Sequence, residues 1–306
     1  MSEIRYIDRR SKKEMIEKVY GRLFIDLFYG NSWIGTLFFH SLLPLIARCS
    51  FFSHLYGKLQ KRKASKRKIA PFIKRFEVDT SEFQESPESF NSFNDFFIRK
   101  LKDCCRPIAP GHDVAVLPAD GRYLVFPDLQ KVDGFVVKAK RFTLEQLLED
   151  RSLAKRYEAG SMVIARLCPV DYHRFHFPCS CTPGAPKLIN GPLYSVNPIA
   201  LKRNICFLSQ NKRVITELDT KYFGRVLFIE VGATYVGSIR QTFTPSEHYA
   251  KGDEKGFFEF GGSSLLLVFE PRTIEFDQDL IDASKRKIEV LGLMGQSLGR
   301  SVRIIA

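Results

Sequence analysis

Cysteine is scarce and irregularly placed in this 306-residue chain, and internal repeats and low-complexity tracts are missing. Seven cysteines, an odd number, do not form the paired framework of a small disulfide-stabilised protein, so we expect a reducing compartment. Cys179 and Cys181 lie one residue apart and no second pair follows, a spacing unlike that of structural zinc sites, so no metal is expected. Charged residues over 3–18 also argue against a secretory signal.

A long apolar run of the kind that spans a bilayer is also missing. The run over 33–47 has only about fifteen residues, contains His40 and is interrupted by Pro44, whereas a spanning helix needs roughly twenty apolar residues. Before this run, apolar residues recur at helical spacing from Ile16 to Phe28, which predicts an amphipathic helix that ends at Gly30.

Positive charge is abundant, with 47 Lys and Arg against 34 Asp and Glu, and seven cations lie within 58–68 without an acid. We interpret the apolar segments as an amphipathic hairpin in a bilayer interface, followed by a basic segment over anionic headgroups. The alternative is that these helices pack on the protein's own core or on a second subunit, beside a solvated basic linker. Nucleic acid is not expected as a partner, because no nucleic-acid-binding motif accompanies the basic run.

An acidic, polar segment over 80–92 has the composition of a linker and divides the chain into an N-terminal helical, membrane-associating segment, 1–80, and a main domain, 81–306. In the main domain we expect a helix after Ser92 and another over 143–150. The remaining β-branched and aromatic runs do not alternate regularly with helices. The fold class expected is therefore α+β, a β-rich catalytic body with N-terminal amphipathic helices.

Residues suited to acid–base chemistry are few, because the chain has only six histidines. His173 and His176 stand together in the segment RLCPVDYHRFHFP. In a strand they would face opposite sides, whereas in a turn both could line one cavity. Asp120 lies in VLPADGR, where an Asp-Gly pair is also an ordinary turn.

Two glycines and two serines interrupt what would otherwise be one strand in FEFGGSSLLLVFE. The interruption is either a bulge or hairpin turn, or a self-processing bond between Gly262 and Ser263. A residue without a Cβ leaves its carbonyl carbon open to attack by the next hydroxyl and tolerates a strained turn. The spacing alone leaves both interpretations open.

Seven blocks, in order and spacing, closely resemble the phosphatidylserine decarboxylase proenzymes from residue 96 onward. They are FFIRKLKDCCRPI (96–108), PADG (118–121), RLCPVDYHRFHFP (166–178), GPLYSVNP (191–198), NKRV (211–214), VGATYVGSI (231–239) and KGDEKGFFEFGGSS (251–264). The N-terminal segments are similar in character to those of membrane-associated members. Ser264 replaces a threonine that is common in the family but keeps the hydroxyl.

The resemblance implies a zymogen that cleaves itself between Gly262 and Ser263 into a large chain, 1–262, and a small chain, 263–306. Ser263 would become a covalent pyruvoyl group, the enzyme's cofactor. By residue match, Asp120, His176 and Ser263 correspond to a triad for self-cleavage, with His176 as the base and Asp120 orienting it. His173 matches the residue that assists decarboxylation or protonates the product carbon.

The implied activity is decarboxylation of phosphatidylserine to phosphatidylethanolamine, through a Schiff base on the pyruvoyl group, in phospholipid biosynthesis. The implied partners are phosphatidylserine, an anionic membrane surface at the cytoplasmic face of the cell membrane, and a second cleaved protomer in a homodimer. Two alternatives stay open: a pyruvoyl-dependent decarboxylase of a soluble amino acid, and an uncleaved membrane-binding module without activity. Arg166, Asn211 and Arg213 lie in matched blocks, where they either contact phosphate or carboxylate groups or support the fold.

Overall fold

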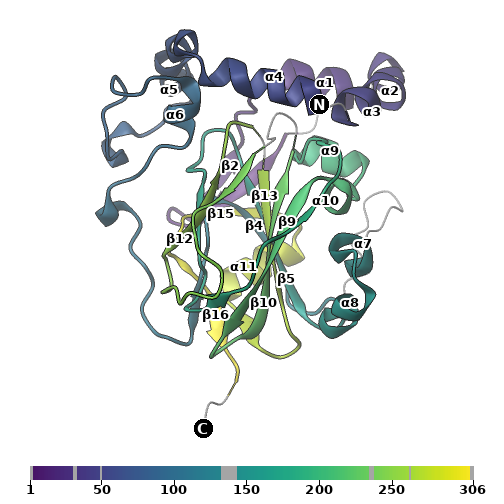
Figure 1. The fold of residues 1–306 in the computed structure, drawn as a ribbon, viewed down its shortest axis with the longest axis vertical. Coiled ribbons are helices and arrows are strands. Elements are labelled where there is room, and N and C mark those ends of the chain that lie inside the picture. Colours follow the sequence, from purple (N-terminus) through teal and green to yellow (C-terminus); the bar gives the residue numbers. More distant parts are fainter. Residues whose placement is uncertain are drawn as a thin grey trace.

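The protein combines one large sheet, two small sheets and a layer of helices, and so confirms the expected α+β, β-rich fold (Figure 1). It is described here from a computed structural model that covers residues 3–29, 33–48, 50–131, 143–233, 238–261 and 263–303. In Figure 1 the N-terminal helices lie across one end of the large sheet, and the C-terminus lies at the opposite end.

The large sheet has ten strands among the described residues, in the order β2-β1-β15-β4-β5-β13-β10-β9-β7, with β8 also paired to β9. Its pairs are antiparallel except for the parallel pair of β1 and β15. The strands are β1 (Arg5–Asp8), β2 (Glu14–Ile16), β4 (Gly121–Phe126), β5 (Ser161–Leu167), β7 (Thr182–Pro183), β8 (Lys187–Ile189), β9 (Arg213–Thr220), β10 (Gly224–Gly232), β13 (Ser263–Phe269) and β15 (Glu289–Gly292).

Two three-stranded sheets accompany the large sheet, and the first of them carries the histidine segment. Its strands are β6 (Arg174–His176), β11 (Ile239–Gln241) and β12 (Glu254–Phe258). The other sheet consists of β3 (Val114–Val116), β14 (Ile274–Phe276) and β16 (Ser297–Ser301).

The helices of the N-terminal third form a layer above one end of the large sheet, and the later helices pack beside it (Figure 1). The first group is α1 (Arg22–Tyr29), α2 (Trp33–His40), α3 (Leu42–Arg48), α4 (Ser50–Lys61), α5 (Ile69–Phe76) and α6 (Phe93–Phe97). The second group is α7 (Leu144–Leu148), α8 (Arg151–Tyr157), α9 (Pro198–Arg203), α10 (Phe207–Gln210) and α11 (Gln278–Lys285). Short 3₁₀ turns cover Lys63–Lys68, Thr80–Glu82 and Asp103–Cys105.

The central strands of the large sheet are buried on both faces, which explains their nearly continuous apolar sequences. Every residue of β5 and of β13 is buried. One face of the sheet packs in a core with the small sheets and α11, and the other packs against α7, α8 and α10. Both helices expected in the main domain are present: the Ser92 side chain caps α6, and Thr143 caps α7.

The beginning of the chain differs from the expected helical segment. Residues 5–8 and 14–16 form β1 and β2, and β1 extends the large sheet by pairing with β15. The helix expected from Ile16 onward therefore starts only at Arg22. Periodicity alone missed this arrangement because the pairing partner, β15, lies more than 270 residues away in the sequence.

Within the described part of the chain, no helix combines the length and apolar character needed to cross a bilayer. The N-terminal third nevertheless exposes large apolar side chains. Among the described residues, eight of the eleven large hydrophobic side chains that are exposed belong to it: Met15, Ile16, Leu27, Leu37, Leu42, Leu45, Leu55 and Leu59.

A buried carboxylate fastens the N-terminal segment to the large sheet. Glu17, whose side chain is only 6% exposed, accepts hydrogen bonds from both terminal nitrogens of Arg166, at 2.7 and 3.2 Å. Arg122 lies 3.6 Å from the same carboxylate and forms an ion pair with Asp171, while Arg166 also binds Glu289 at 2.6 Å. Burial would raise the pKa of Glu17, but the two arginines hold it below its usual value, so Glu17 is ionised.

We expect Glu17→Gln to destabilise the protein by about 3 kcal/mol, because it leaves buried arginine charge without its full compensation. Glu14→Gln is the matched control: Glu14 lies on the adjacent β2, is 40% exposed and pairs with Arg5 at the surface. The control should change stability by about 0.5 kcal/mol or less. Urea unfolding followed by circular dichroism measures both values, and equal effects of the two variants would contradict the structural role of Glu17.

Candidate functional site

The candidate site residues meet at one end of the large sheet. There β4 begins, β5 ends, β13 begins and β10 ends, because neighbouring strands run antiparallel. Ser263, the first residue of β13, pairs with Leu167 on one side and Gly232 on the other. Asp120 precedes β4, two strands away from Ser263, a separation of about 10 Å at the usual strand spacing.

The Ser263 hydroxyl is fully buried and has no hydrogen-bond partner among the described residues. The neighbouring Ser264 hydroxyl is in the same condition. Unpaired buried polar atoms are costly and uncommon in folded proteins, so two in succession make this position unusual. Gly262 lies outside the described residues, and Gly261 before it has a φ of +147°, a backbone conformation that favours glycine.

His173 is buried, neutral and has one free ring nitrogen. Its ring lies against Phe97, with centroids 3.8 Å apart, and its Nδ1 donates to the Asp171 carbonyl oxygen at 3.0 Å. Because a carbonyl oxygen only accepts, the proton must be on Nδ1, which leaves a lone pair on Nε2. Nε2 is buried and has no partner among the residues that the structure describes, and burial lowers the pKa of His173 to about 3. His173 is therefore a neutral base whose free lone pair is enclosed by the protein.

His176 is also buried, but both of its ring nitrogens have partners. Nδ1 donates to the Gly252 carbonyl oxygen at 2.9 Å, and Nε2 lies 3.2 Å from the Tyr172 hydroxyl. Burial lowers the pKa of His176, while the charges of Glu254 and Asp120 partly oppose this effect. Burial also raises the pKa of Tyr172, so its hydroxyl keeps its proton and can donate it to Nε2.

Asp120 is held by an arginine and a backbone amide. Arg106 donates to both carboxylate oxygens, at 2.6 to 3.2 Å, and the Met294 amide donates at 2.9 Å. The turn that carries Asp120 also contacts the histidine segment directly, because the His176 amide donates to the Pro118 carbonyl oxygen at 2.8 Å. The turn that carries Asp120 and the strand that carries His176 are thus joined through their backbones, and the Asp120 carboxylate itself is bound by Arg106.

The structure brings Asp120, His173, His176 and Ser263 to one end of the sheet, but no hydrogen bond joins any two of these four side chains. The two histidines pair with different residues of β12, the strand that leads toward Ser263. The His173 carbonyl pairs with the amide of Phe258, whereas His176 lies opposite Glu254, four residues further from Ser263. The catalytic roles expected for these residues stay predictions.

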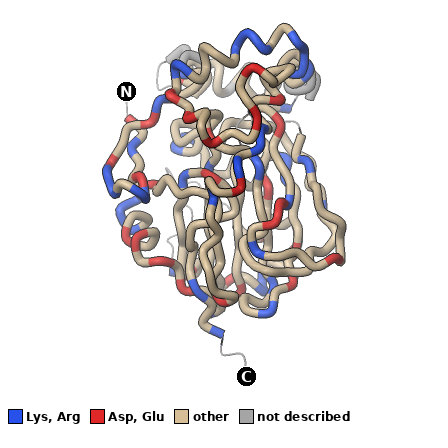
Figure 2. The backbone as a smooth tube through the Cα atoms, turned by 90° about the vertical axis from the view of Figure 1, so that its left-hand side faces the viewer, with Lys and Arg blue, Asp and Glu red and all other residues tan. Residues whose placement is uncertain are grey.

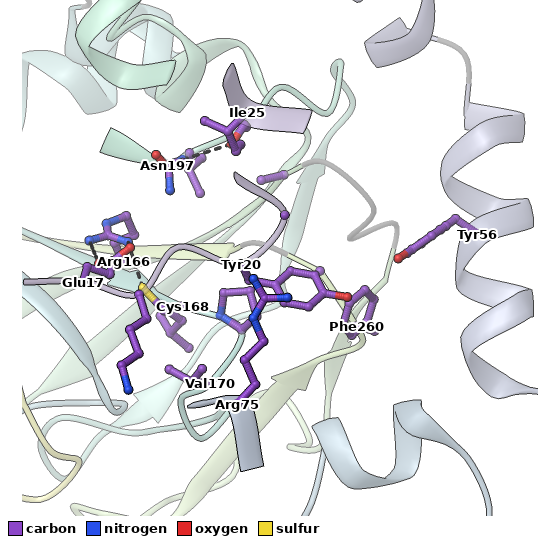
Figure 3. Close-up of a pocket in the computed structure, with 18 residues that line it drawn as sticks. Glu17, Tyr20, Ile25, Tyr56, Arg75, Arg166, Cys168, Val170, Asn197 and Phe260 are labelled. Atoms are coloured by element: carbon purple, nitrogen blue, oxygen red, sulfur yellow. Dashed lines mark hydrogen bonds and ion pairs between the residues drawn. The ribbon is translucent and has the colours of Figure 1, made fainter. Parts of the chain in front are cut away.

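A cavity of about 410 Å³ opens beside Phe260 and Gly261 (Figure 3). These residues directly precede the expected cleavage site, and we call them the cleavage segment. Its inner wall includes Phe260, Gly261 and Leu167, the strand partner of Ser263. Its outer wall comes from the N-terminal segment and its helices, through Tyr20, Ile25, Tyr56 and Arg75. The cavity is thus closed on one side by the catalytic body and on the other by the N-terminal third of the chain.

Three matched residues whose role the sequence left open prove to support the fold. Arg166 is neutralised by Glu17 and Glu289, as described above. Arg213 donates hydrogen bonds to backbone carbonyls and to the Glu149 carboxylate, the latter at 3.2 Å. The Asn211 side-chain amide donates to the carbonyl oxygen of Gly232, the other strand partner of Ser263. They position the strands around Ser263.

Sequence reasoning overlooked Glu17, Arg106 and Tyr172 as residues of the site. Arg106 and Tyr172 lie inside matched blocks, so only their side-chain type could have drawn attention to them. Glu17 lies in the N-terminal segment and had no signal beyond an acid within an apolar pattern.

Comparison with known proteins agrees with the geometry. The sequence profile of the phosphatidylserine decarboxylase family matches residues 93–300. The chain belongs to the phosphatidylserine decarboxylase family. It is 48% identical over 303 residues to the phosphatidylserine decarboxylase proenzyme of Chlamydia pneumoniae, with 99% of each chain covered. It is 48% identical to the proenzyme of Chlamydia caviae, covering 99% of this chain and 100% of the relative, and 47% identical to that of Chlamydia felis, covering 99% of each. The phosphatidylserine decarboxylase resemblance seen in the motifs is thus confirmed over nearly the whole chain.

The buried state of His173 predicts that stability falls in mild acid. Its pKa is about 3 in the folded protein and near 6.5 when exposed, so between these values the unfolded chain binds the extra proton. Its contribution should decrease by about 1.4 kcal/mol per pH unit as the pH falls below 6.5. His173→Gln should flatten this dependence between pH 7 and 5 in urea titrations. His248→Gln, at an exposed position, is the control, and identical slopes for both variants would contradict the assignment.

Proposed function

We propose that this chain is the precursor of a pyruvoyl-dependent enzyme that converts phosphatidylserine to phosphatidylethanolamine in phospholipid biosynthesis. The observation that carries the proposal is the buried, unpartnered Ser263 hydroxyl at the end of the sheet that also holds Asp120, His173 and His176. An inert membrane-binding module would have no use for such a costly group. The family membership supports the same function.

Self-cleavage would begin at Ser263. With His176 as the base that removes the hydroxyl proton, Oγ attacks the Gly262 carbonyl carbon, and the peptide bond is replaced by an ester. Removal of the Ser263 Cα proton then expels the Gly262 carboxylate, which ends the large chain. The dehydroalanine that remains takes up water and releases ammonia, and a ketone is left at the start of the small chain. Asp120 would favour the protonated state of His176 through its nearby negative charge.

The residues around position 263 fit a pyruvoyl group. The Ser264 hydroxyl and the His173 Nε2 are both buried without partners, so polar groups are available to a ketone and to a bound headgroup. The pyruvoyl group supplies an electron-accepting carbonyl for the loss of carbon dioxide. His173 would hold or deliver a proton at Nε2, and Phe97 and Phe260 exclude water around it, with ring centroids 4.9 Å apart.

The N-terminal layer would bring this site to the membrane. Its exposed leucines on α1 to α4 form apolar surface, and Figure 2 shows Lys and Arg along the same end of the molecule. Apolar side chains next to cations are the composition that binds an anionic bilayer interface. The resemblance further suggests peripheral attachment at the cytoplasmic face and a homodimer of cleaved protomers, which light scattering of the cleaved protein would test.

Substitutions should separate self-cleavage from decarboxylation. Ser263→Ala should remain one uncut chain, and His176→Ala or Asp120→Asn should slow cutting by about 100-fold or more, the usual effect of losing a general base. His173→Ala should still be cut but should release little carbon dioxide from phosphatidylserine. Denaturing gels measure cutting, and carbon dioxide release measures activity.

His248→Ala, at an exposed position, serves as the control and should behave like the unchanged protein. If His176→Ala matured at the normal rate while His173→Ala stayed uncut, the free Nε2 of His173 would be the base instead. If Ser263→Ala were still cut at the same bond, the self-cleavage proposal would be wrong.

Membrane binding should depend on the exposed leucines of α2 and α3. Leu37 is 58% exposed and Leu45 is 67% exposed, so replacing both by serine removes apolar contact without disturbing the core. We expect binding to anionic vesicles to weaken about tenfold or more, from the lost burial of two leucines. Leu188→Ser, 52% exposed on β8, is the matched control. If the unchanged protein, the double leucine variant and Leu188→Ser floated equally with vesicles, this role of the helical layer would be contradicted.

A further inference from the structure

The cavity beside Gly261 carries more positive than negative charge. Its ionisable lining consists of Glu17, Lys18, Arg75 and Arg166, together with the phenols of Tyr20 and Tyr56 and the thiol of Cys168. Arg166 is neutralised within the buried network by Glu17 and Glu289. The charge that remains for a ligand therefore belongs to Lys18 and Arg75, on the outer wall.

These two cations differ in how they are already engaged. Lys18 forms a surface ion pair with Glu77 at 2.8 Å. Arg75 has no ion pair with any acid in the part of the chain that the structure describes, and its guanidinium lies 5.5 Å from the ring of Phe76. In Figure 3 the Arg75 side chain extends toward the ring of Tyr20 inside the cavity. Burial raises the pKa of Tyr20, and a hydrogen bond with Tyr56 and, to a smaller extent, the positive charge of Arg75 oppose this effect.

The helix that carries Arg75 is firmly packed. One turn before Arg75 on α5, Phe72 contacts Phe93 and Phe96, with ring centroids 5.3 and 5.6 Å apart. Phe93 in turn contacts Phe260, at 5.2 Å, next to the cleavage segment. The same aromatic cluster thus fixes the position of the inner wall and the backbone of the helix that presents Arg75.

We propose that Arg75 binds the phosphodiester of the phospholipid substrate and sets how deeply the headgroup enters the cavity. The inference rests on the proposed function and adds the group that selects a phospholipid over a free amino acid. The serine amine and carboxylate occupy the inner end, near Ser263, and the phosphate follows at the outer wall. A guanidinium matches a phosphate through two parallel hydrogen bonds, whereas Lys18 is already paired with Glu77.

The shape of the cavity agrees with a diester rather than free phosphate. Its volume of about 410 Å³ has room for a headgroup and the start of the acyl chains. Its walls include the apolar or aromatic side chains of Tyr20, Ile25, Tyr56 and Phe260, which a free phosphate ion would not use. The wall formed by Ile25 and Tyr56 belongs to α1 and α4, the layer that exposes the leucines, so acyl chains leave the cavity toward that surface.

Kinetics on monomeric dihexanoyl phosphatidylserine test the proposal without a membrane surface. Arg75→Gln should raise KM about tenfold or more while kcat changes about twofold or less, because the contact is made equally in the bound and reacting states. Arg75→Lys should fall between, since an ammonium lacks the paired donors. Lys74→Gln, the exposed neighbour on α5, is the control and should leave KM unchanged. An unchanged KM in Arg75→Gln that is fully self-cleaved would overturn the proposal.

A binding measurement keeps the test independent of turnover. Cleaved protein is titrated with dihexanoyl phosphatidylcholine or with inorganic phosphate, and binding is measured by calorimetry. We expect the diester to bind with an affinity that falls in Arg75→Gln, and inorganic phosphate to bind far more weakly than the diester. Tighter binding of inorganic phosphate than of the diester would make this a free-phosphate site and overturn the proposal. A wild-type protein that is cleaved but releases no carbon dioxide from phosphatidylserine would refute the proposed function, while the titration would still decide whether Arg75 holds a phosphodiester.

Discussion

The arrangement of the site depends on charges buried at one end of the large sheet. Arg122 and Arg166 project from adjacent strands, and they are neutralised by Asp171 from the histidine segment and Glu17 from the N-terminal segment. Because a buried charge without a partner is costly, these four residues can adopt few other arrangements. The same ion pairs therefore fix the loop that carries His173 and the N-terminal segment that closes the cavity.

The N-terminal third is consequently part of the site as well as the surface that we propose contacts the membrane. It supplies Glu17 to the buried network, Tyr20 to the cavity, and Lys61 to an ion pair with Glu259, 2.7 Å apart and just before the cleavage segment. A membrane contact on α1 to α4 would thus lie against the groups that surround the reacting bond. This arrangement would deliver a lipid headgroup to Ser263 without requiring the acyl chains to leave the apolar phase.

Much of this organisation could be predicted from local sequence, and some of it could not. Local sequence patterns predicted the helices that begin after Ser92 and Thr143 and the buried apolar strands. The motif blocks identified the family. The strands β1 and β2 were missed because their pairing depends on β15, far along the chain. The hydrogen-bond partners of the site were missed for a similar reason: Arg106 holding Asp120, and Gly252 and Tyr172 holding His176, arise from tertiary contacts that leave no local pattern.

Self-cleavage before Ser263 can be measured through the mass of the purified wild-type protein under denaturing conditions. We expect two chains, one of 262 residues and one of 306 − 262 = 44 residues, the smaller having lost the Ser263 nitrogen in forming its ketone. A single intact chain of 306 residues, persisting after long incubation, would show that the protein does not cleave itself.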